Sequence, residues 1–232
     1  FYYNHSDAED QRYWFRRQIR LANELHMPIV IHAREADQET MDILKEEGAF
    51  SEERCGWFPP RPGTGIGRKA GAQTTQKASR AGEGGQAEAC EAGRAEACDC
   101  TRTDLDAMRA EACDCTENCC MEKDARVLLH CFSGSRELAE QYVKLGATIS
   151  IAGPVTYKNN RKTSEVVSAI PIEYLLVETD APYLTPEPHR GKKNQSPYVA
   201  YTARRVALLK GISYEEAARR TLENAKRFYG ID

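Results

Sequence analysis

The sequence predicts an α/β fold in which parallel strands alternate with helices, and three observations support this prediction. Short apolar runs, rich in Val, Ile and Leu, recur between segments whose apolar residues have helical spacing. Three of these runs lead into a side chain that can bind a metal, at His32, His130 and Asp180. Prolines and glycines mark the ends of several segments. Strands and helices that alternate at this length favour right-handed crossovers and hence a parallel sheet.

The N-terminal part is predicted to form a helix, a strand and a second helix. Ser6 and Glu9 have the spacing of a capping box, and the apolar residues after them recur at helical spacing. A proline ends this helix and opens a strand at residues 28–32. The second helix covers about residues 35–47 and stops at Gly48.

The same alternation resumes in the C-terminal part. The predicted elements are a strand at 127–132, a helix at 135–145, a strand at 147–152, a short helix at 164–169, a strand at 174–179, and closing helices at 197–210 and 213–229. With the N-terminal strand this makes four strands. A closed TIM-type barrel needs eight.

The ends of the strands carry the candidate chemistry. In α/β barrels, the carboxyl ends of the strands and the loops after them form the active face. Imidazole nitrogens and carboxylate oxygens suit zinc, manganese or magnesium. We therefore expect His32, His130 and Asp180 to converge, with side-chain tips within roughly 8 Å, because two-metal sites hold ions ~3.5–4 Å apart. Alternatively, each histidine is a hydrogen-bonded core residue.

Several motifs resemble those of the TatD family of metal-dependent deoxyribonucleases, which are of the amidohydrolase type. In chain order they are PIVIHAREA at 28–36, LHCFSG at 129–134, LVETDAPY at 176–183, PHRGKKN at 188–194 and ENAKRFYG at 223–230. The resemblance covers roughly residues 1–50 and 125–232. It implies a metal-dependent hydrolase that cleaves phosphodiester bonds of DNA, built on a TIM-type (β/α)8 barrel. This chain would supply about four C-terminal strands with their helices.

The resemblance also implies a metal site with up to two divalent ions, Mg, Mn or Zn. His32 and His130 would hold one ion, and Asp180 would hold the other and orient the attacking water as a catalytic residue. The family's His-x-His pair and metal-bridging glutamate strand do not occur in this sequence. We therefore expect a half-barrel with little nuclease activity alone, and self-association or poor solubility because its sheet edges are unpaired.

Three basic residues are candidates for substrate binding. Arg34 stands inside a motif of the resemblance, and Arg190 and Lys192 belong to a basic loop. They could hold phosphates, which position nucleic acid without reading its sequence. Alternatively, they are simply solvated. Glu178, two residues before Asp180, either supports a metal ligand or belongs to a buried ion pair.

Composition limits the partners of the chain. The formal net charge of −3 and the pI of about 6.0 argue against binding nucleic acid over a broadly basic surface, so contact with DNA should be local. No apolar run approaches the ~18 residues that span a bilayer, and no leader with a cleavage site is recognisable. We expect a cytoplasmic protein without a membrane partner.

Residues 51–124 differ from the rest of the chain. They hold nine of the sixteen glycines and eight of the nine cysteines, and residues 94–101 recur as residues 109–116. Large aliphatic residues are so rare there that burial could not offset the conformational entropy lost on folding. We interpret this segment as a disordered insertion between two strands.

Two other interpretations stay open. The chain could be a catalytically dead, truncated remnant of the same family. It could instead be a cysteine-rich metal-binding protein, although its paired cysteines are adjacent or one residue apart, whereas structural zinc sites favour two to four residues between them. Translated non-coding sequence would explain the repeat equally well.

Overall fold

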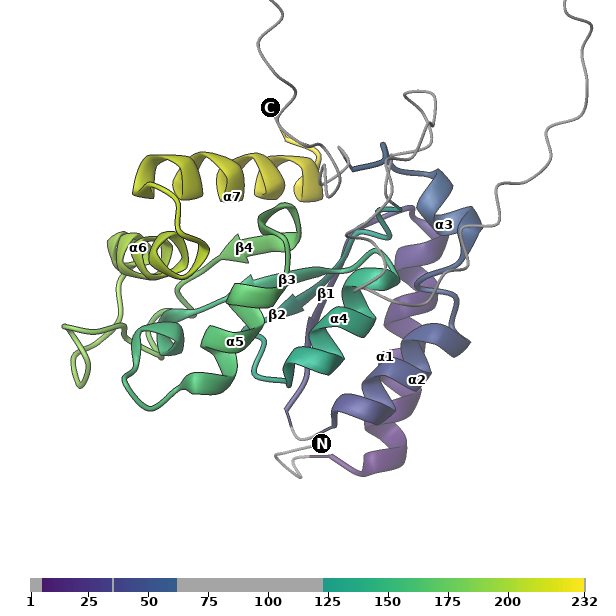
Figure 1. Ribbon diagram of the computed structural model, residues 1–232. Helices are drawn as coiled ribbons and strands as arrows, with labels where there is room; N and C mark the ends of the chain where they lie inside the picture. The colour runs from purple at the N-terminus through teal and green to yellow at the C-terminus, as the bar shows by residue number, and fades with distance from the viewer. Residues whose placement is uncertain (1–5, 35, 62–122, 232) are drawn as a thin grey trace, which may run out of the picture. The chain divides into compact units, whose positions relative to one another are not determined.

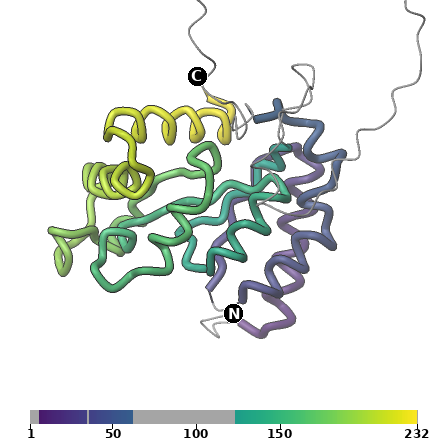
Figure 2. Tube along the Cα trace, in the orientation of Figure 1, coloured from purple at the N-terminus to yellow at the C-terminus, as the bar shows by residue number. Residues whose placement is uncertain are grey.

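The computed structural model describes residues 6–34, 36–61 and 123–231. The strands are β1 (Ile29–His32), β2 (Val127–His130), β3 (Thr148–Ile151) and β4 (Leu175–Val177). The α-helices are α1 (Ala8–Glu24), α2 (Asp37–Glu46), α3 (Glu52–Gly56), α4 (Arg136–Lys144), α5 (Arg161–Ala169), α6 (Val199–Lys210) and α7 (Tyr214–Tyr229). The 3-10 helices are η2 (Gly153–Thr156), η3 (Ile172–Tyr174) and η4 (Ser196–Tyr198). Figure 2 follows this order from α1 in purple to α7 in yellow.

The four strands form one parallel sheet in the order β1-β2-β3-β4. Ile29 pairs with Val127 and His32 with His130, so β1 and β2 end at the same level. Because all four strands run in the same direction, their carboxyl ends lie at one edge of the sheet. The predicted parallel α/β fold is confirmed.

One face of the sheet packs against α1, α2, α4 and α5, and Figure 1 shows α4 and α5 lying across the strands. Alternate strand residues point to this face. They are Ile29, Ile31, Val127, Leu129, Ile149, Ile151 and Leu175, none more than 7% exposed. Burying one such side chain contributes about 1.5–3 kcal/mol to stability, so this layer holds the fold together.

The opposite face is covered in part by α7. Leu128 and Leu176 form a second buried cluster with Phe228 of that helix. On the edge strand β1, Val30 remains 50% exposed. This face is therefore closed beneath α7 and open along β1.

Local signals set the helix ends, with one correction. Ser213 caps α7, and Gly230 ends it at a φ of 66°, a conformation that glycine adopts without strain. The predicted capping box of Ser6 is wrong, because Asp7 caps α1 and accepts a hydrogen bond from the Glu9 N–H at 3.0 Å. A carboxylate there also interacts favourably with the helix dipole.

The folded unit continues past residue 50, where the insertion is predicted to begin. Arg54 is fully buried, and its guanidinium donates to the carbonyls of Ala125 and Met27. Arg61 is also fully buried and forms an ion pair with Asp124 at 3.0 Å. Predicted disorder is thus wrong for residues 51–61 and 123–124, because the buried Arg54, Arg61 and Asp124 anchor segments that are poor in aliphatic residues. The rest of the predicted insertion, residues 62–122, lies outside the described residues.

A membrane span is not found in the helices that the structure describes. None of them is both long and apolar enough to cross a bilayer.

Candidate metal centre

Two histidines lie side by side at the carboxyl edge of the sheet. His32 and His130 are register partners on neighbouring parallel strands, so their side chains project from the same face. Their ring centroids are 5.7 Å apart and the ring planes are inclined by 44°. Each histidine is the last residue of its strand, which places both rings where the following loops begin.

The His130 ring is oriented by Glu178. Its Nδ1 lies 2.5 Å from one carboxylate oxygen of Glu178, and the other oxygen accepts the backbone N–H of Cys131 at 2.5 Å. Because Nδ1 is engaged, Nε2 is the ring nitrogen left to bind a ligand. Glu178 thus fixes the orientation of the His130 ring.

Asp180 completes the convergence. Its Oδ1 lies 3.3 Å from Nε2 of His130. Because β4 ends at Val177, Asp180 belongs to the following loop, where its φ of 55° lies in the left-handed region that Asp tolerates better than most residues. His130 thus lies beside both His32 and Asp180, as the predicted convergence requires of these two pairs. Their role as metal ligands stays a prediction.

Asn194 supports the loop that carries Asp180. Its side-chain amide donates to the carbonyls of Thr179 at 2.7 Å and Tyr183 at 2.5 Å, and its backbone N–H donates to the carbonyl of Pro182. Asn194 is 3% exposed, so these bonds are shielded from water. Our sequence reasoning missed this residue, although it ends the motif at 188–194 and could have been found there.

The neighbouring thiol is not suited to act as a nucleophile. Burial, together with the negative charges of Glu178 and Asp180, raises the pKa of Cys131 to about 12. A thiol with this pKa stays protonated at neutral pH, whereas nucleophilic attack requires the thiolate. The chemistry of this site therefore rests on imidazole and carboxylate groups.

The three candidate phosphate-binding residues lie on loops after strands. Arg34 follows β1 by two residues and is exposed. Arg190 and Lys192 are exposed in the loop after Asp180, where the Arg190 guanidinium lies 4.4 Å from the Tyr157 ring centroid. The Lys192 carbonyl accepts a hydrogen bond from the Thr185 hydroxyl at 2.6 Å. Their contact with a substrate stays a prediction.

The donor atoms suit a divalent metal, but they form only part of a coordination shell. A metal-binding histidine usually donates the N–H of its other ring nitrogen to a carboxylate, a carbonyl or a water. Even so, within the described ranges no three His, Cys, Asp or Glu side chains are arranged to hold one ion. The paired cysteines at 98–100, 113–115 and 119–120 lie outside the described residues.

Sequence comparisons match most of the chain to one family. The model described as TatD related DNase matches residues 1–55 and 107–230. The uncharacterized metal-dependent hydrolase YabD of Bacillus subtilis is 33% identical over 232 residues, which is 100% of this chain and 62% of YabD. The uncharacterized metal-dependent hydrolase YcfH of Escherichia coli K12 is 44% identical over 109 residues, 47% of this chain and 41% of YcfH.

Solved structures support the same fold. YJJV, a TatD homologue from Escherichia coli k12, has a TM-score of 0.60 at 20% identity and covers 97% of this chain and 58% of its own. A TatD family hydrolase from Entamoeba histolytica has a TM-score of 0.60 at 16% identity, with the same coverage. The four strands therefore have the fold of a TatD-type TIM barrel. The chain spans about three fifths of the length of YabD (62%) and YJJV (58%).

Proposed function

Because this chain belongs to the TatD-related DNase family, we propose that it forms part of a divalent-metal hydrolase that cleaves phosphodiester bonds of DNA. The curated relatives are named metal-dependent hydrolases. The observation that carries the proposal is that His130, at the end of β2, lies beside both His32, at the end of β1, and Asp180, in the loop after β4. The activity of the whole protein is part of this proposal, since the relatives are longer than the chain.

Each residue has a defined task in this proposal. His32 and His130 would bind an ion through their ring nitrogens, and Asp180 would bind metal and orient a water molecule toward the phosphate. A bound Mg, Mn or Zn ion polarises the phosphate and lowers the pKa of bound water. Glu178 keeps Nε2 of His130 directed at Asp180.

The surrounding residues would position the substrate and the loop. Asn194 holds both sides of the turn that carries Asp180, which preserves the distance between carboxylate and imidazole. Arg34, Arg190 and Lys192 would contact phosphates of the DNA backbone, giving binding that does not depend on base sequence.

The test is metal-dependent hydrolysis of bis(p-nitrophenyl) phosphate and of an end-labelled single-stranded oligonucleotide. It compares the 232-residue chain with a fusion in which the portion of YabD that precedes the matched region is placed before residue 1. We expect little turnover by the chain alone, because its donor set is incomplete among the described residues. We expect metal-dependent turnover by the fusion, abolished by Asp180→Asn.

Controls keep this test decisive. Lys45→Ala removes an exposed charge on α2 and should leave turnover by the fusion unchanged. If a folded fusion binds Mn²⁺ but cleaves neither substrate, phosphodiester hydrolysis is rejected as the function.

A second candidate function is a non-catalytic member of the family. It is favoured by the absence, within the described ranges, of three side chains arranged around one ion. Robust cleavage by the 232-residue chain alone, lost in Asp180→Asn, rejects this candidate. Inactivity of both the chain and the fusion supports it.

A further inference from the structure

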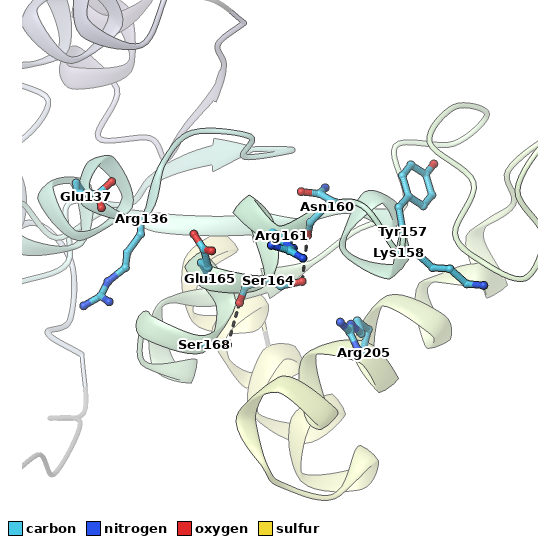
Figure 3. Close-up of a pocket in the computed structure, with 10 residues that line it drawn as sticks. All are labelled: Arg136, Glu137, Tyr157, Lys158, Asn160, Arg161, Ser164, Glu165, Ser168 and Arg205. Atoms are coloured by element: carbon cyan, nitrogen blue, oxygen red, sulfur yellow. Dashed lines mark hydrogen bonds between the residues drawn. The ribbon is translucent and has the colours of Figure 1, made fainter.

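A cavity of about 510 Å³ lies between the start of α4, the loop from η2 to α5, α5 itself and α6 (Figure 3). Its lining is rich in cationic side chains. These are Arg136, Lys158, Arg161 and Arg205. Two carboxylates, Glu137 and Glu165, also line it. The lining is therefore net positive, in contrast to the chain as a whole.

The charges of the lining are mixed near α4 and α5 and positive near α6. Figure 3 shows Glu137 and Arg136 on the α4 side, Glu165 beside Arg161 on α5, and Lys158 and Arg205 farther along. Arg136 already forms an ion pair with Glu140 at 2.6 Å. Because Arg136 is paired with Glu140, the α4 end of the cavity has no excess of positive charge and is not expected to attract an anion.

The other end carries uncompensated positive charge. Among the described residues, Lys158, Arg161 and Arg205 form no ion pair with a carboxylate. The Nε of Arg205 is buried and has no hydrogen-bond partner among those residues. A buried donor without a partner costs free energy, and an anion that accepts its hydrogen bond removes this cost. These features indicate a site for an anionic group.

Tyr157 connects this cationic end to the loop that carries Asp180. It lines the cavity, and its ring lies 4.4 Å from the Arg190 guanidinium. Its hydroxyl donates to the carbonyl of Thr185 at 3.0 Å. Tyr157 thus joins the cavity wall to the loop after Asp180. One cation, Arg190, lies on that loop, and another, Lys158, lies in the cavity wall.

The N-terminus of α5 adds to the positive electrostatic potential of the cavity. Arg161 is the first residue of α5, and Asn160 caps that helix by accepting the Thr163 N–H at 3.1 Å. The N-terminus of a helix carries partial positive charge and favours anions. This adds to the cluster of cations without being the basis of the site.

We propose that this cavity binds a backbone phosphate of the nucleic-acid strand whose scissile bond lies at Asp180. The inference rests on the proposed function. Lys158, Arg161 and Arg205 supply the donors, and the Tyr157–Arg190 contact joins the cavity to the loop that follows Asp180. A strand is favoured over a free phosphate ion because the cationic surface continues from the cavity to Arg190 on that loop.

The test is binding of a fluorescein-labelled 16-nucleotide oligothymidylate to the 232-residue chain, followed by anisotropy in EDTA from 50 to 200 mM NaCl. We expect Lys158→Ala/Arg161→Ala to weaken binding about tenfold. We also expect the slope of log K against log salt to fall by about 1.4, since each contact with single-stranded nucleic acid contributes about 0.7. Both residues are exposed, so the fold should be kept.

The matched control is Lys45→Ala/Lys144→Ala, which removes two exposed cations from α2 and from the C-terminal turn of α4. We expect less than a twofold change. An equal loss in both double variants, or no binding by the unsubstituted chain, overturns the proposal. So does calorimetric binding of inorganic phosphate that Lys158→Ala/Arg161→Ala removes while leaving oligothymidylate affinity unchanged.

The two proposals fail in different ways. If the cavity variant binds oligothymidylate as tightly as the unsubstituted chain does, the cavity proposal is overturned and the hydrolase proposal stands. If the cavity variant loses affinity but no phosphodiester is ever cleaved, strand binding at the cavity stands, whereas the hydrolase proposal fails together with the placement of a scissile bond at Asp180.

Discussion

The two faces of the sheet are built from alternate residues of the same four strands, yet they serve different purposes. The face under α1, α2, α4 and α5 is aliphatic along its whole length. The opposite face changes character along the strands. Thr148, the first residue of β3, accepts a hydrogen bond from the buried Arg61, and its register partner Leu128 packs with Leu176 on Phe228. The imidazoles of His32 and His130 stand at the carboxyl end.

This difference shows how one short strand can carry both stability and chemistry. In β2, Leu129 packs into the main core while its neighbour His130 contacts Glu178 and Asp180. Because successive side chains alternate between faces, a substitution one residue along a strand exchanges a structural effect for a functional one.

The largest expected effect is at the buried, charged end of the opposite face. Arg61→Ala leaves Asp124 with Arg227 at 3.3 Å as its remaining side-chain ion pair among the described residues. Removing one partner of a buried ion pair costs about 3–5 kcal/mol. Because Asp124 keeps its ion pair with Arg227, we expect the free energy of unfolding to fall by about 3 kcal/mol. Urea denaturation measures this loss. Arg219→Ala, an exposed control on α7, should cost less than about 1 kcal/mol. Equal losses would contradict a structural role for this end.

The next effect separates the two faces within the apolar layer. Ile149 is fully buried on the helix-covered face, so Ile149→Ala should lower the free energy of unfolding by about 2–5 kcal/mol. Val30 is 50% exposed on the opposite face of β1, so Val30→Ala should lower the free energy of unfolding by less than about 1 kcal/mol. Both values come from urea denaturation followed by circular dichroism. Similar losses would mean that β1 is covered on both faces.

A smaller effect is expected at the carboxyl end, on binding rather than on stability. Glu178→Gln keeps the shape of the side chain but removes the carboxylate that orients His130. We expect Zn²⁺ affinity to fall about 10–100-fold, as for other groups that support metal-binding histidines. Titration calorimetry measures the affinity, with exposed Glu165→Gln as the control. Unchanged affinity in Glu178→Gln would show that His130 does not bind the ion.

The smallest effect concerns a charge in the helix layer. Lys210 donates to the carbonyls of Ser168 and Ile170, and burial lowers its pKa from 10.5 to about 8. Between pH 8 and 10.5 the unfolded state therefore binds more protons, so the free energy of unfolding should rise with pH in this window. Below pH 8 Lys210 is charged in the folded state as well, so the full destabilisation from burying its charge is present there. Denaturation at pH 7.5 and 9.5 should show this rise in the chain and lose it in Lys210→Met.

Local pattern was enough to locate most elements and the three converging residues. The strands and helices follow from apolar spacing, prolines and glycines, which act over a few residues. The strand-end positions of His32, His130 and Asp180 follow from the same pattern, because parallel strands share one carboxyl edge. The sequence by itself therefore determined the fold class and the candidate centre.

Only the tertiary structure decided which side chains support that centre and where the folded unit ends. Glu178 and His130 are 48 residues apart in sequence, and Arg61 and Asp124 are 63 apart. The spacing of residue types along the sequence cannot predict such contacts, because they depend on how the sheet brings distant segments together. Whether a charged side chain is buried depends likewise on the residues that surround it in the fold. The sequence pattern at 51–61 therefore predicts an insertion, although the buried Arg54 and Arg61 anchor this segment in the fold.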